Sequence, residues 1–134
     1  MIKQLAHLCI QTRDLEATER FYRDALGCEK AFEFLRQNKW FGFYLKLGHN
    51  SFIEVFEGET SEPGNINHLA LEVEDIDDAI RRVKEHGYEI GEKKLGCDNT
   101  WQVWLKDPNG VRIELQQYTT KSLQFTGGTC IADW

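Results

Sequence analysis

The chain has 134 residues, 41% of them hydrophobic and 28% charged, and its 16 Lys and Arg against 22 Asp and Glu give a net charge of −6. This length fits one domain, or two small halves that share a core. An acidic chain without a Lys or Arg cluster argues against nucleic acid or an anionic membrane as its main partner. The sequence has no apolar run of membrane-spanning length and no signal-peptide pattern at its start, so we expect a cytoplasmic protein.

The first part of the chain, residues 3–57, shows the pattern of a βαβββ unit. Apolar residues alternate in LAHLCI (5–10), as in a half-buried strand. Asp14 stands where a helix N-cap belongs and Gly27 where the left-handed residue after a helix belongs. Three further strands are expected, at 29–36, 39–47 and 51–57.

A linker rich in Gly, Ser and acidic residues (58–65) leads to a second part, 66–118, with the same order of elements. A strand at 67–73 precedes a helix that runs from Asp75 to Gly87. The three strands that follow are expected at 88–94, 100–106 and 111–118, and the last two are joined by the turn DPNG, with Pro and Gly at the positions that a tight turn favours. Residues 119–134 lie beyond the repeat as a tail with no assigned element.

The two parts are copies of one another. His7 matches His68 at an offset of 61 residues, and Glu54 matches Glu114 at an offset of 60, with one residue deleted in the second helix. Ordered similarity of this kind indicates a duplicated structural unit. The sequence therefore predicts an α+β fold made of two tandem βαβββ modules.

Strand alternation separates the core residues from a second, more polar face. Ile53 and Val55 should pack beneath a helix, which directs Glu54 to the opposite side. By the same parity His7, His68 and Glu114 share that opposite side. If the two sheets face one another, these four residues converge, and two imidazoles with two carboxylates suit a divalent transition metal (Ni, Co, Zn, Mn or Fe) better than Ca or Mg.

Each of these residues also has a structural interpretation. A single strand histidine is more often a partly buried core residue than a ligand, and Glu54 could form an ion pair with Arg112 or Lys46. The four cysteines form no CxxC pair, and without an export signal they are expected to be free thiols: Cys9, Cys28, Cys97 and Cys130.

Three segments carry a family resemblance: HLCIQTRDLEATERFYRDALG, NHLALEVEDIDDAIRRVKEHG and LKDPNGVRIEL. They resemble the vicinal oxygen chelate superfamily, also called the glyoxalase/bleomycin resistance/dioxygenase superfamily, over residues 3–118. The resemblance implies paired modules that form an open, cup-shaped mixed sheet with the helices outside. It also implies a metal held by the first and last strands of each module, at the positions of His7, Glu54, His68 and Glu114, and a homodimer.

Within the superfamily the metal positions are most similar to glyoxalase I, a lyase/isomerase that converts a 2-oxoaldehyde–thiol hemithioacetal to a thioester. That likeness implies Ni or Co, with Zn also possible by donor type, and a small-molecule substrate that carries a thiol conjugate. It makes Glu114 the catalytic base and Glu54 its partner across the metal. The residues expected to line the substrate pocket are Arg112, Trp104, Tyr44, Lys106 and Gln11.

The resemblance also has departures, and other activities stay open. Glyoxalase I carries Arg and Asn for glutathione where this chain has Gln11 and Gly58; Arg13 or Arg112 could substitute. Methylmalonyl-CoA epimerase is similar but commonly has Gln at the position of Glu54. A thiol transferase, a dioxygenase and a drug-binding resistance protein without catalysis are the remaining alternatives.

Overall fold

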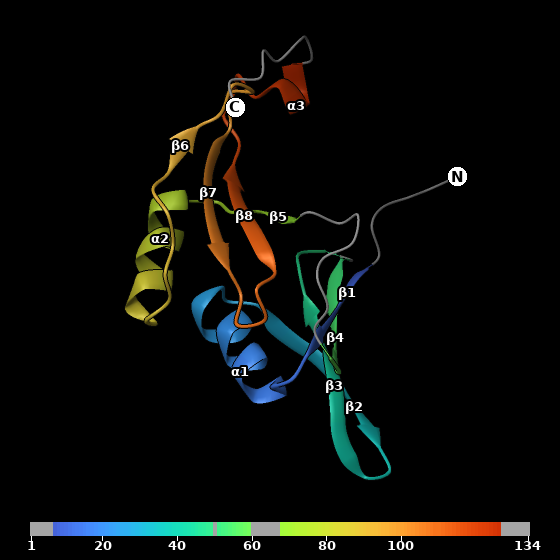
Figure 1. Cartoon of the computed structure of the whole chain (residues 1–134). Helices are drawn as coiled ribbons and strands as arrows, with labels where there is room; N and C mark the ends of the chain where they lie inside the picture. Colours follow the sequence, from blue (N-terminus) through green and yellow to red (C-terminus); the bar gives the residue numbers. More distant parts are fainter. Residues whose placement is uncertain (1–6, 50, 60–67, 127–134) are drawn as a thin grey trace, which may run out of the picture. The chain divides into compact units, whose positions relative to one another are not determined.

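The computed structural model describes residues 7–49, 51–59 and 68–126. These residues form two compact units. Unit 1 spans residues 1–63 together with the turn Asp107–Gly110, and unit 2 spans 64–106 and 111–134. Each contains one four-stranded mixed sheet with helical segments, so the α+β expectation is confirmed (Figure 1). The prediction that both modules make one domain stays a prediction.

Unit 1 follows the predicted order of elements. It contains β1 (His7–Thr12), α1 (Leu15–Arg20), η1 (Phe21–Ala25), β2 (Glu29–Arg36), β3 (Lys39–Lys46) and β4 (Phe52–Glu57). The sheet order is β1-β4-β3-β2, with β1 parallel to β4 and the other pairs antiparallel. Phe43, Leu45, Ile53 and Val55 are fully buried, which confirms the strand parity predicted for Ile53 and Val55.

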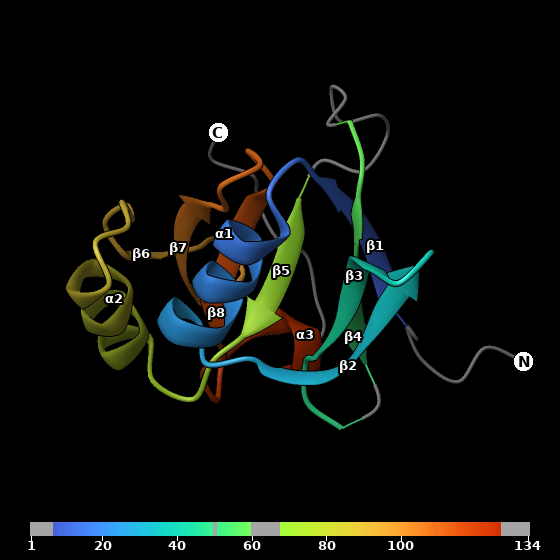
Figure 2. The ribbon, with the colours of Figure 1, turned by 90° about the horizontal axis from the view of Figure 1, so that it is seen from below.

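Unit 2 repeats this topology. It contains β5 (Leu69–Glu72), α2 (Ile76–Glu85), β6 (Lys94–Leu95), β7 (Trp101–Lys106), β8 (Arg112–Gln117) and α3 (Leu123–Thr126). The sheet order is β5-β8-β7-β6, with β5 parallel to β8. Helix α2 lies against β7 and β8, and the colours of Figure 2 let the reader follow the same strands from below.

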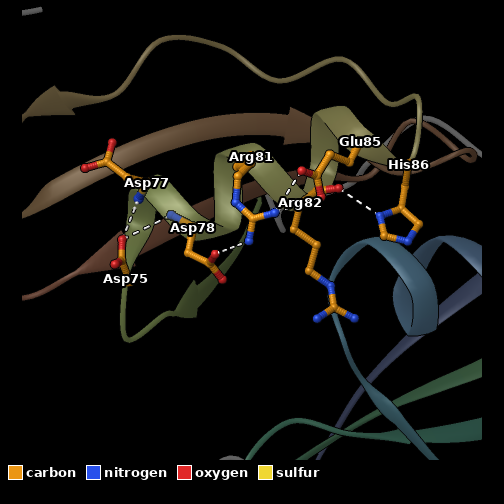
Figure 3. Close-up of polar contacts among 7 residues, drawn as sticks. All are labelled: Asp75, Asp77, Asp78, Arg81, Arg82, Glu85 and His86. Carbon is orange, nitrogen blue, oxygen red and sulfur yellow. Dashed lines mark hydrogen bonds and ion pairs between the residues drawn. The ribbon is translucent and has the colours of Figure 1, made fainter.

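The helix caps form where the sequence placed them. Asp14 accepts a hydrogen bond from the backbone N–H of Ala17, and Asp75 accepts from Asp77 and Asp78 (Figure 3). Figure 3 also shows Arg81 paired with Asp78 and Glu85 along the exposed side of α2. The bonds accepted by Asp14 and Asp75 satisfy backbone N–H groups that the first turn of each helix leaves without a partner.

The first helix differs from the second by one π-helical turn. At η1 the N–H of Leu26 reaches back five residues to the carbonyl of Phe21, at 3.4 Å. A π turn holds one residue more than an α-helical turn of the same height. The extra residue of the first copy, where the repeat offset changes from 61 to 60, is therefore accommodated without displacing Gly27, which has the expected positive φ of 71°.

Two expectations are corrected. Residues 88–93 do not form the predicted strand: only Ile90 makes a bridge, to Leu105, before the two-residue β6. Gly87 precedes this stretch and Gly91 lies within it, and glycine weakens strand pairing. Cys97 is disulfide-bonded and not the free thiol that was expected. Sequence spacing did not reveal it, because a disulfide requires only that the two Cα atoms lie close together in space. Cys9 and Cys28 are free as expected, and Cys130 lies outside the described residues.

The start of the tail forms a short helix packed on the loop before β7. The N–H of Leu123 donates to the carbonyl of Asp98 at 2.9 Å, and Thr100 Oγ1 donates to Ser122 Oγ at 3.0 Å. Thr100 and Ser122 are both fully buried. Among the described residues there is no helix long and apolar enough to span a membrane.

Candidate metal centre

The two metal-ligand candidates of unit 2 lie side by side. His68 immediately precedes β5, and Glu114 sits in β8 opposite Ala70 of β5 and Trp104 of β7. His68 Nε2 is 3.6 Å from Glu114 Oε2, and the two side chains are 35% and 8% exposed. Ile113 and Leu115 on either side of Glu114 point into the core, which fixes the carboxylate on the opposite face.

The spacing of this pair is close to the one that a shared cation requires. Two ligand atoms that are each about 2.1 Å from a metal lie about 3.0 to 3.5 Å apart at coordination angles near 90 to 110°. The observed 3.6 Å is close to that range and longer than a direct hydrogen bond. An imidazole nitrogen and a carboxylate oxygen are also the donors that Zn, Ni and Co accept. The residues present therefore fit a divalent transition metal.

Trp104 contacts the histidine of this pair, and Arg112 contacts Trp104. The ring of Trp104 meets His68 edge to face, with centroids 4.9 Å apart, and restricts how the imidazole can turn. The guanidinium carbon of Arg112 lies 4.9 Å from the centroid of the Trp104 ring. Two of the predicted pocket residues are thus placed next to the predicted metal ligands of the same unit.

Glu54 holds the corresponding position in unit 1. It lies in β4, opposite Cys9 of β1 and Tyr44 of β3. The Cys9 thiol and the Tyr44 hydroxyl both hydrogen bond to its carboxylate. Loss of water around the thiol, this bond and the charge of Glu54 raise the pKa of Cys9 to about 11, and the same causes raise the pKa of Tyr44. Both groups are therefore protonated donors at neutral pH.

His7, the fourth predicted metal ligand, is placed here by its backbone position alone. It is the first residue of β1 and pairs in register with Phe52, two positions before the pairing of Cys9 with Glu54. Its side chain lies outside the described ones. Among the side chains that the structure does describe, no three His, Cys, Asp or Glu form one cluster that could hold a metal.

Aromatic rings surround Glu54 in unit 1. Tyr44 stacks on Phe32 at 4.6 Å between centroids and lies 5.7 Å from Phe52, while Phe34 lies 4.9 Å from Phe56. Phe32 is 49% exposed. The equivalent strands of unit 2 carry Gln102, Arg112 and Gln116 instead. The two copies have kept the carboxylate and changed what surrounds it.

Comparison with known proteins decides the family. The Glyoxalase/Bleomycin resistance protein/Dioxygenase superfamily matches residues 4–115, most of the chain. The chain belongs to this superfamily. This family and the fold confirm the resemblance drawn from the three sequence segments.

One curated relative and two solved structures illustrate what the chain is similar to. The ethylmalonyl-CoA/methylmalonyl-CoA epimerase of Cereibacter sphaeroides is 34% identical, with 87% of this chain and 99% of the relative covered. The structure of TnmS3, an antibiotic-binding protein from a Streptomyces species, has a TM-score of 0.74 at 21% identity, covering 88% and 98% of the two chains. The lactoylglutathione lyase of Agrobacterium tumefaciens has a TM-score of 0.68 at 18% identity, covering 87% and 94%. The two structures support the fold alone.

The predicted pocket residues of this superfamily member fall into two groups. Tyr44 contacts Glu54, Trp104 contacts His68, and Arg112 lies over the Trp104 ring. Gln11 is exposed and pairs in register with Phe56, and its side chain packs beside Gly58, while Lys106 is exposed opposite Arg112 at the end of β7.

Lys46, an alternative ion-pair partner for Glu54, has a different partner, and three residues near the sites were not predicted. Lys46 pairs with Glu29 at 2.9 Å. Cys9 was not among the predicted site residues, although its strand parity with His7 placed it on the same face. Lys84 and Tyr88 were missed as pocket-lining residues because the segment after α2 was expected to be a regular strand.

Proposed function

We propose that this protein is a metal-dependent lyase or isomerase that moves a proton next to the carbonyl of a small substrate. His7, Glu54, His68 and Glu114 are the proposed metal ligands, contributed as one His and Glu pair from each module. The observation that carries the proposal is the distance of 3.6 Å between His68 Nε2 and Glu114 Oε2, with the Glu114 carboxylate buried. Glu54 supports it, since the repeat places a second carboxylate at the equivalent strand position.

Glu114 is the proposed general base and acid. Its carboxylate is nearly buried on the polar face of β8, so few waters compete for the proton that it removes and returns. A bound divalent cation would supply Lewis-acid stabilisation of the negative charge that develops on the substrate oxygen. Trp104 would hold the His68 imidazole in place, while Cys9 and Tyr44 orient Glu54 through their hydrogen bonds.

Two substrate classes follow from this chemistry. The first is the hemithioacetal of a 2-oxoaldehyde, turned over as by lactoylglutathione lyase. The second is an acyl thioester epimerised at the carbon next to its carbonyl. The 34% identity to an ethylmalonyl-CoA/methylmalonyl-CoA epimerase over nearly the whole length of that relative favours the second. Both need a base beside a metal, and both would be served by a homodimer or by a single chain.

Metal analysis combined with hydrogen exchange tests the proposal. The purified chain should contain about one equivalent of a divalent transition metal, and with methylglyoxal plus glutathione or with methylmalonyl-CoA it should exchange a substrate carbon-bound hydrogen for deuterium in D2O. Glu114→Gln should lower the exchange rate by about 100-fold or more, because it removes the general base. Glu92→Gln, which changes an exposed carboxylate in the same unit, serves as the matched control. Protein without stoichiometric metal that gains no exchange activity from Ni, Co, Zn, Mn or Fe(II) would overturn it.

A binding protein without catalysis is the second candidate. The stacked rings of Phe32 and Tyr44 and the half-exposed Phe34, Phe52 and Phe56 form a surface on which a planar ligand could stack. Tight binding of an aromatic antibiotic that is unaffected by removing metal, with no hydrogen exchange in either substrate, would favour this second function over the first.

A further inference from the structure

Unit 2 contains a pocket of about 860 Å³, and one of its lining residues, Trp104, also contacts His68. Its walls come from the C-terminal end of α2, the irregular segment 88–91 and the facing ends of β7 and β8. The side chains that give it its chemistry are Lys84, Tyr88, Glu89, Trp104, Lys106 and Arg112. Residues 88–91 run beside β7 without forming a regular strand: Ile90 bridges Leu105, and the N–H of Gly91 donates to the carbonyl of Trp104 at 2.9 Å.

The charge that lines the pocket is opposite in sign to the net charge of the whole chain. The whole chain carries a net charge of −6, yet three cations and a single carboxylate, that of Glu89, line this pocket. Lys84 and Lys106 form no ion pair with any residue in the described part of the chain, although Lys93 and Arg81 of the same unit are paired with acids of α2. Several cations that line one pocket attract an anion to it.

The pocket is too large for a simple anion and has aromatic walls. Sites for small molecules are typically about 300 to 1,000 Å³, and this one falls in the upper part of that range. Trp104 and Tyr88 are half-exposed, which leaves ring surface available to a planar group. Arg112 approaches the Trp104 ring and places a planar, positively charged group at the same wall.

We propose that this pocket binds a phosphorylated ligand with a planar ring, of the class of a nucleotide or a nucleotide-bearing carrier. Lys84 and Lys106 contact the phosphate oxygens, and Trp104 or Tyr88 stacks on the ring. Since Trp104 also packs on His68, a ligand in this pocket lies next to the proposed metal site. On the proposed function, the phosphorylated group is then the handle of the substrate, and the reacting carbonyl extends from it towards Glu114.

Calorimetric titration of the full chain tests this proposal, with ADP as the probe. ADP should bind, adenosine should bind at least about tenfold more weakly because it has no phosphate, and the affinity for ADP should fall as salt rises. Lys84→Gln combined with Lys106→Gln should weaken ADP binding by about tenfold or more. Lys94→Gln combined with Lys121→Gln removes the same charge from exposed lysines outside the pocket and should leave the affinity unchanged.

The outcomes separate this proposal from the proposed function. Glu114→Gln should abolish hydrogen exchange and still bind ADP, so a failure of the metal chemistry leaves the ADP titration interpretable. ADP that does not bind, or binds equally well to both double variants, overturns the phosphate pocket. Citrate that binds as tightly as ADP also overturns it, because the pocket would then select charge without phosphate or ring.

Discussion

The buried hydroxyl of Tyr22 allows a sharp test of how unit 1 is held together. Tyr22 Oη donates to Asp107 Oδ2 at 3.2 Å, and the two residues are 0% and 5% exposed. Tyr22→Phe keeps the ring and removes only this bond. A hydrogen bond to a charged group contributes about 1.5 to 3 kcal/mol. Asn109 still donates to Asp107 from its backbone (2.8 Å) and from Nδ2 (3.4 Å), so we expect a loss near the lower end, about 1.5 to 2 kcal/mol.

Urea unfolding followed by tryptophan fluorescence measures this loss. The midpoint should shift to lower urea with an unchanged m value, since the surface exposed on unfolding is the same. Tyr118→Phe is the matched control, because Tyr118 is half-exposed and its change should stay within about 0.5 kcal/mol. A loss below about 0.5 kcal/mol for Tyr22→Phe would refute the reasoning that the buried bond to Asp107 stabilises unit 1.

The same variant has a distinct pH dependence. Burial, followed by the charge of Asp107 and the hydrogen bond to it, raises the pKa of Tyr22 well above its usual 10.0. Above about pH 10 the unfolded chain loses the tyrosine proton while the folded chain keeps it, so the free energy of unfolding falls with rising pH. Phenylalanine has no such proton. The stability difference between the wild type and Tyr22→Phe should therefore be constant below pH 9 and shrink above pH 10.

Three further predictions concern other parts of the structure. Gly42→Ala should lower the free energy of unfolding by about 2 kcal/mol or more, since the added Cβ would stand 2.3 Å from a backbone oxygen of β4. Gly91→Ala is the control, because its added Cβ meets nothing closer than 3.4 Å, and thermal unfolding measures the stability of both variants. In a Cys28→Ser background, Cys9 should react slowly with a disulfide reagent at pH 8 despite its exposure, and Glu54→Gln should lower the Cys9 pKa and speed the reaction; equal rates would contradict the assigned cause. Asp75→Ala should cost about 1 kcal/mol by leaving two N–H groups of α2 uncapped, measured by urea unfolding.

The sequence predicted most of the fold because its signals are local and occur twice. Asp14 and Asp75 mark both helix starts, Gly27 and Gly87 mark both ends, and alternation places Ile53 and Ile113 in equivalent cores. Parity alone put Glu114 on the face where the structure brings it to His68. Pairing and parity follow from backbone geometry, which periodicity can reveal.

What the sequence could not predict depends on contacts between distant residues. The disulfide of Cys97 follows from how close two Cα atoms are in space. Residues 88–93 do not form the predicted strand, and Lys84 and Lys106 line one pocket there. These two lysines are 22 positions apart in sequence and come from a helix and a strand, so the sequence did not predict that they would line the same pocket. The π turn η1 was visible only as an unexplained one-residue gap in the repeat.

The turn between β7 and β8 has a consequence for how such a chain can be divided. Asp107–Gly110 lies within the second sequence copy but packs within unit 1, where Asn109 forms hydrogen bonds with Thr12 and Thr18. A polypeptide cut in the linker would leave the amino-terminal fragment without four of its own packing residues, which the other fragment carries. We expect the fragments to be unstable separately and to recover structure when mixed.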